Sequence, residues 1–255
     1  MPNIDAMKER AMDPKWIAKT FGIVFLLTWV TGIAGRVLLD PVYSEANFVL
    51  GDGADVRVFL GAVFEFGVIA TNIATAVILY PIAKRFSETG AVGYVTARLV
   101  ESAFILVGLM SLLTVVTLQQ DVAATAGADA ASLVTAGKVL TATYDWAFLF
   151  GPGLMAGVGN GLILGYVMYH SGLIPRRLAI LGLVAGSVHI VGFLGVLFGA
   201  FEAGSPPQFA FTALEMVWEA ALPIYCIWKG FKPTETISLD ARAAAVEPTM
   251  ATATT

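Results

Sequence analysis

The chain has 255 residues, of which 57% are hydrophobic and only 13% are charged, and its formal net charge is -4. Soluble domains carry about 25% charged residues, so this chain lacks the polar side chains that would cover a surface in water. The composition also excludes a disordered chain, a disulfide-rich secreted scaffold and a basic nucleic-acid-binding protein. The remaining class is a protein whose main solvent is the lipid bilayer.

Six segments are long and apolar enough to cross a membrane, for which a helix needs about 20 mainly apolar residues. Each is continuously apolar and does not alternate, which favours helices over barrel strands. The predicted spans are 17–37, 57–80, 94–118, 144–169, 178–200 and 208–228. The sequence therefore predicts an all-α polytopic membrane protein with a six-helix transmembrane domain over 17–229. A cytoplasmic segment 1–16 precedes this domain, and a mobile cytoplasmic tail 230–255 follows it.

The connecting segments predict the orientation of the bundle. Six spans place both termini on one side, and eleven basic residues fall on that side: Lys8, Arg10, Lys15, Lys19, Lys84, Arg85, Arg176, Arg177, Lys229, Lys232 and Arg242. Only Arg36, Arg57 and Lys138 fall on the other side, where 38–56 and 119–140 are expected as loops, the second with a short interfacial helix. The positive-inside rule then predicts cytoplasmic termini in the plasma (inner) membrane.

Two acidic residues in the sixth span and one in the second are candidates for function. A charge at the bilayer centre costs about 2.5–3.5 kcal/mol, so such residues usually face the bundle interior. Glu219 is interpreted either as a protonatable carboxylate in a cavity or as a partner for Arg98. Glu65 lies in the outer half of its span. Glu215 lies four residues before Glu219 and so shares its helix face, but it is expected nearer the outer face, in contact with water.

The third span carries Arg98 and Glu101, which lie three residues apart and so share a helix face. They are interpreted as an internal ion pair, with Arg98 also reaching the interface, or as a site that binds an anion or relays a proton. His189 is interpreted as a neutral packing residue or as a proton relay. Its distance from His170 disfavours a haem, and no metal site, cofactor or catalytic motif is predicted.

Glycine and proline mark two more features of the predicted spans. Gly151, Pro152 and Gly153 predict a helix break or kink in the fourth span, and Pro223 predicts a kink in the sixth. One face of the fourth span lacks side chains at every fourth residue, which is typical of tight helix contact. The glycines of that face are Gly153, Gly157, Gly161 and Gly165.

Four sequence blocks together carry a family resemblance. They are residues 72–87, residues 96–113, residues 144–186 with the motifs GPG and LIPRRLA, and residues 217–233 with the ending WKGFKP. Over residues 16–233 the chain resembles a bacterial integral membrane family called domain of unknown function 4386. The resemblance implies a polytopic membrane fold and brings no activity with it.

Three functions are compatible with these observations. The first is a small-solute or ion translocator with a polar cavity lined by Glu65, Arg98, Glu101, His189 and Glu219. The second is a structural or regulatory membrane subunit whose charges only hold the bundle together, and the third is an intramembrane enzyme. The expected partners are the lipid bilayer and another membrane protein or a second copy of the chain, with no nucleic acid. A small-molecule ligand is left unidentified.

Overall fold

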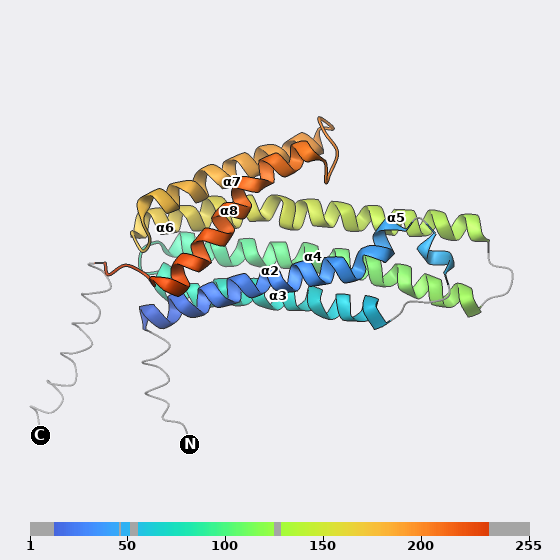
Figure 1. Ribbon diagram of the computed structural model, residues 1–255, viewed down its shortest axis with the longest axis horizontal. Helices are drawn as coiled ribbons and strands as arrows, with labels where there is room; N and C mark the ends of the chain where they lie inside the picture. Colours follow the sequence, from blue (N-terminus) through green and yellow to red (C-terminus); the bar gives the residue numbers. More distant parts are fainter. Residues whose placement is uncertain (1–12, 46, 52–55, 125–128, 235–255) are drawn as a thin grey trace, which may run out of the picture.

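The computed structural model describes residues 13–45, 47–51, 56–124 and 129–234, and every regular element in these ranges is helical (Figure 1). The elements are α2 (Pro14–Ser44), η1 (Phe48–Leu50), α3 (Val56–Ala83), α4 (Glu88–Ala124), α5 (Ala130–Phe150), η2 (Gly151–Leu164), α6 (Gly165–Ser171), α7 (Arg176–Leu197) and α8 (Pro206–Trp228). Since α5, η2 and α6 form one continuous rod, six rods are long and apolar enough to span a membrane. The predicted all-α, six-span architecture is confirmed. Residues 1–12 and 235–255 of the predicted terminal segments lie outside the described residues.

The helices on the side away from the termini are longer than their apolar runs. The helix α4 continues to Ala124 and α5 begins at Ala130, so most of the loop expected over 119–140 is helical. Asp129 caps α5 by accepting hydrogen bonds from the Ser132 hydroxyl and the Ala131 backbone N–H, and these bonds lower the pKa of Asp129. A capped, alanine-rich segment has a high helix propensity, which explains the extension beyond the hydrophobic run.

The six rods close into a ring. Each rod packs against the next one in the chain, and α8 returns to pack against α2. The start of α2 and the end of α8 lie at the same end of the bundle, here called the proximal end, and α7 and α8 diverge from α4 and α5 towards the other, distal end (Figure 1). Large apolar side chains such as Val30, Val63 and Phe209 are exposed on the outer surface, as expected where the solvent is lipid.

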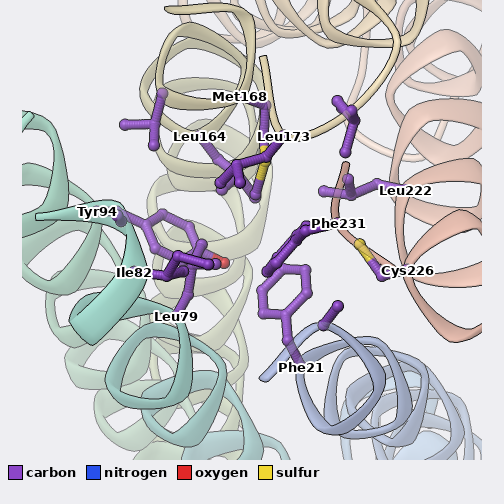
Figure 2. Packing of buried hydrophobic residues seen from close by; sticks show 14 of the residues in the cluster. Phe21, Leu79, Ile82, Tyr94, Leu164, Met168, Leu173, Leu222, Cys226 and Phe231 are labelled. Carbon is purple, nitrogen blue, oxygen red and sulfur yellow. The ribbon is translucent and has the colours of Figure 1, made fainter. Parts of the chain in front are cut away.

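Two apolar clusters fill the bundle at different depths. The proximal cluster draws on all six rods and on the residues after α8, and its members include Phe21, Leu79, Ile82, Tyr94, Leu164, Met168, Leu173, Leu222, Cys226 and Phe231 (Figure 2). The backbone N–H of Lys232 donates to the carbonyl of Leu173, which holds the segment carrying Phe231 against the bundle. The distal cluster joins α2, η1, α3, α4 and α5 and includes Leu39, Val58, Leu109, Leu112 and Tyr144.

The fourth rod changes its helical geometry where the sequence predicts a break. It continues without interruption, but from Gly151 to Leu164 it takes the wider turns of a π-helix. Pro152 cannot donate a backbone hydrogen bond and its ring crowds the preceding turn, and wider turns accommodate both effects. π-helical segments occur often at functional sites, and this one faces the centre of the bundle.

Candidate functional site

A cavity of about 390 Å³ lies inside the ring of helices. Along each of α2, α3 and α4, the residues that line the cavity come between residues of the proximal cluster and residues of the distal cluster. The cavity therefore occupies the middle of the bundle between two apolar layers. The structure brings all five predicted polar residues to its wall, namely Glu65, Arg98, Glu101, His189 and Glu219. Arg36, Asn72, Asn160 and Glu215 also line it.

Arg98 is bound inside the protein and does not reach the membrane interface. Its side chain is 2% exposed, Nη1 donates to Glu101 Oε2 at 2.8 Å, and Nη2 donates to the Asn72 carbonyl oxygen Oδ1 at 2.5 Å. The Arg98 guanidinium also lies 5.6 Å from the ring centroid of Phe25. The interpretation that Arg98 reaches the interface was therefore wrong, and the ion pair with Glu101 is present. A charge at this depth needs such close partners, because water is excluded from it.

Glu219 is held by neutral hydrogen-bond donors. The Asn160 amide nitrogen donates to Oε1 at 2.5 Å, and the Trp29 indole N–H donates to Oε2 at 3.3 Å. The backbone carbonyl of Asn160 in turn accepts the indole N–H of the fully buried Trp218. The structure thus supports the interpretation of Glu219 as a cavity carboxylate, since Arg98 takes Glu101 as its ionic partner.

Glu215 departs from the expectation of a solvated residue near the outer face. It is 2% exposed, and both carboxylate oxygens lack a hydrogen-bond partner among the described residues. It lies one helical turn from Glu219 on α8 and lines the same cavity. The spacing of four residues already placed the two acids on one helix face, and that was the signal for Glu215. The expected contact with water was wrong because this face of α8 lines the interior cavity.

Arg36 is a cavity residue that the sequence interpretation assigned to the outer side. It lies inside α2, where Nη1 donates to the Tyr144 hydroxyl at 3.0 Å and the guanidinium is 4.4 Å from the ring centroid of Phe148. Glu65 packs nearby against the backbone of Gly35. Because α2 continues to Ser44, Arg36 lies a full two turns before the end of the helix. No pattern in the sequence indicated this extension.

His189 faces the π-helical rod. Its side chain is buried, it lies beside the carbonyl groups of Pro152 and Gly153, and neither ring nitrogen makes a hydrogen bond of ordinary geometry with the described residues. Among those residues, no group of three or more His, Cys, Asp and Glu side chains could hold a metal ion. His189 therefore contributes an unpartnered polar ring to the cavity wall.

The glycine face of the fourth rod meets α7. A Cβ on Gly157, Gly161 or Gly165 would lie 3.1 Å or less from the backbone of α7, whereas one on Gly153 would meet only its own rod, at 3.4 Å. Pro223 lies within α8, and its carbonyl oxygen would be 2.6 Å from a Cβ on Gly22 of α2. Glycine thus permits two backbone-to-backbone approaches around the cavity, between η2 and α7 and between α2 and α8.

Comparison with known proteins assigns most of the chain to one family. No curated protein and no solved structure matches the chain. A family model described as Domain of unknown function (DUF4386) matches residues 20–230, a range that contains every residue lining the cavity and nearly all of the six rods. The resemblance carried by the GPG, LIPRRLA and WKGFKP motifs thus extends over most of the chain. The chain belongs to the DUF4386 family.

Proposed function

We propose that this protein translocates a small solute across the membrane and that the central cavity is the place where the solute binds. One observation carries the proposal: ionisable and amide side chains from α3, α4, η2, α7 and α8 converge on one cavity between two apolar layers. Ionisable residues inside a membrane are costly and mark substrate or ion pathways. A cavity of about 390 Å³ also falls within the range of roughly 300–1,000 Å³ typical of small-molecule sites.

The alternative is a structural subunit whose charges only hold the helices together. The arrangement of Arg98, Glu101 and Asn72 would suit that role, because Arg98 donates hydrogen bonds to both of the other side chains. Glu215 would not, because both of its buried carboxylate oxygens lack a hydrogen-bond partner among the described residues. Buried polar groups are nearly always hydrogen-bonded, so polar atoms on a cavity wall favour a site that receives a ligand.

Translocation requires the cavity to open towards each side in turn. In this structure the proximal cluster closes one side, with Phe231 and Cys226 among its buried members. We place the moving contact between α2 and α8, which cross closely at Gly22 and Pro223. Pro223 leaves one backbone carbonyl of α8 without its helical hydrogen bond, which makes this part of the helix suited to bending.

The proposal includes a location in the plasma membrane with both termini in the cytoplasm. The first and last rods have their terminal ends on the same side of the bundle (Figure 1). Basic residues gather at that proximal end, including the pairs Lys84–Arg85 and Arg176–Arg177 that flank the turns there. This distribution supports a cytoplasmic proximal end under the positive-inside rule.

Uptake into proteoliposomes tests the translocator. The purified protein is reconstituted, and a defined mixture of amines, amino acids, sugars and nucleosides is offered outside, with the internal content measured by mass spectrometry. Ala156→Phe places a ring in the cavity that Ala156 lines, so uptake of the transported solute should fall to the level of protein-free liposomes.

The matched control is Ala70→Phe, which makes the same change on the exposed outer surface of α3 and should leave uptake unchanged. If no solute enters above the protein-free level, or if Ala156→Phe takes up solute as fast as the unaltered protein, the translocator proposal is wrong.

A further inference from the structure

The chemistry of the cavity wall identifies a class of solute, and this inference rests on the proposed function. Glu215 and Glu219 lie on successive turns of α8, and both line the cavity. Glu219 receives two neutral N–H donors, whereas both oxygens of Glu215 are buried and unpartnered among the described residues. The Oδ1 atom of Asn160 is also buried without a partner and lies on the same wall. The wall therefore offers hydrogen-bond acceptors that the described residues leave unused.

The positive charges of the cavity are already engaged elsewhere. Arg98 binds Glu101 and Asn72, and Arg36 donates to Tyr144 and lies over aromatic rings. Within the described ranges, no Lys, Arg or His nitrogen lies within 4.0 Å of a carboxylate oxygen of Glu215 or Glu219. The lining holds four carboxyl groups and two guanidinium groups. When these groups are ionised, the cavity has an excess of negative charge at the α8 wall.

The rest of the wall is apolar and aromatic. Besides the polar groups, the cavity is lined by Phe25, Trp29, Ile33, Phe104, Phe148 and Met216, among others. Aromatic faces attract cations and accommodate flat apolar bodies. A bare inorganic cation would need several oxygen ligands around one point, and the described residues offer no group of three such side chains.

We infer that the cavity binds an organic cation, namely an amine whose ammonium N–H groups donate to Glu215 and Glu219 and whose apolar body packs on the aromatic wall. An ammonium group supplies the positive charge and the donors that these two carboxylates lack, and charge-assisted hydrogen bonds are the stronger kind. The cavity volume leaves space for a body of several carbon atoms beside the ammonium group.

Three probes of similar size and shape test the class of ligand. They are 2-phenylethylamine as the cation, propylbenzene as the neutral analogue and 3-phenylpropionate as the anion, each titrated into the purified protein at neutral pH. Binding is measured by isothermal titration calorimetry and by the thermal shift, because a ligand that binds only the folded protein raises its melting temperature. We expect saturable binding and a rising melting temperature for 2-phenylethylamine alone.

Glutamine variants test the location. Glu215→Gln and Glu219→Gln should each lose the response to 2-phenylethylamine, while Glu202→Gln, at an exposed residue in the turn between α7 and α8, should keep it. Glu215→Gln is the decisive variant, because Glu215 has no hydrogen bond to lose within the described structure. If Glu219→Gln fails to fold, Glu215→Gln still decides the question.

The outcomes separate this inference from the translocator proposal. An equal response to propylbenzene or 3-phenylpropionate, no response to any probe, or full binding by Glu215→Gln would overturn the organic-cation site. Uptake of only neutral or anionic solutes that Ala156→Phe blocks would also overturn it, while leaving the translocator standing. Binding of 2-phenylethylamine that depends on Glu215, without uptake of any solute into liposomes, would support the cation site and overturn the translocator.

Discussion

At the residue scale, Arg98 is the best-partnered charge in the cavity. Its two terminal nitrogens donate to Glu101 and Asn72, and only its Nε lacks a partner in the described structure. A buried ion pair adds little net stability over apolar residues of the same size, but removing one partner leaves the other as an uncompensated buried charge. The two kinds of substitution should therefore differ sharply in their effect on stability.

The prediction is that Arg98→Met destabilises the protein by about 3–5 kcal/mol, because Glu101 then remains buried without its partner. The double variant Arg98→Met, Glu101→Met should regain a large part of this loss. Lys138→Met, which changes an exposed basic residue of α5 in the same way, should change stability by less than about 0.5 kcal/mol. Reversible unfolding in mixed micelles measures all three, and a double variant as unstable as Arg98→Met would contradict the argument.

Spacing along a helix explains which site residues the sequence could predict. The pair Arg98 and Glu101 follows from a separation of three residues, and the shared face of Glu215 and Glu219 follows from a separation of four. The partners Trp29 and Asn160 of Glu219 come from other rods. Contacts between rods depend on how each helix is rotated and tilted, and one sequence does not contain that information.

At the scale of the element, the π-helical segment η2 combines wide turns with close packing. Five of its fourteen residues are glycine, and two of them, Gly157 and Gly161, place bare backbone against α7. Around Gly161 and Gly186 the two rods approach so closely that neither residue has space for a Cβ. The hydrophobic effect does not bring helices together inside the lipid bilayer. Small residues stabilise the association of membrane helices because they allow the backbones to pack closely.

The second prediction compares two glycines of the same face. A Cβ in Gly161→Ala would lie 2.8 Å from the backbone nitrogen of Gly186 and 3.0 Å from Glu215 Oε2, so one of the rods must shift. The expected loss of stability is about 1–3 kcal/mol, the usual range for overpacking. Thermal unfolding in detergent measures it.

The control for this comparison is Gly153→Ala, whose Cβ would be in ordinary contact at 3.4 Å with its own rod. It should unfold at the same temperature as the unaltered protein or slightly above it, because alanine favours a helix more than glycine does. Equal losses in the two variants would mean that the glycines act through helix propensity and not through contact with α7.

Hydropathy predicts where each membrane helix lies but does not predict where the helix ends. Hydropathy located all six rods, because about 20 apolar residues are needed to cross the bilayer. It ended α2 at residue 37 and α4 at residue 118, whereas these helices continue to Ser44 and Ala124. Helical structure does not stop where apolarity stops, and the extra turns of α2 place Arg36 well inside the helix and not at its end.

At the scale of the whole molecule, the structure is asymmetric between its two ends. The proximal cluster draws on all six rods and on the segment after α8, and it lies between the cavity and the proximal end. The distal cluster joins α2 to α5 without α7 and α8, which diverge towards that end (Figure 1). The cavity accordingly extends to Gln208 and Thr212 in the first turns of α8.

The last prediction concerns which side of the membrane each end faces. With Cys226→Ala removing the only natural cysteine, single cysteines are introduced by Glu202→Cys at the distal end and by Glu88→Cys at the proximal end, both at exposed glutamates. Because basic residues gather at the proximal end, a membrane-impermeant maleimide added to intact cells should label Glu202→Cys at once. Glu88→Cys should be labelled only after the membrane is permeabilised. The reverse pattern would mean that the distal end faces the cytoplasm, whereas labelling of both variants in intact cells would contradict the six-span topology itself.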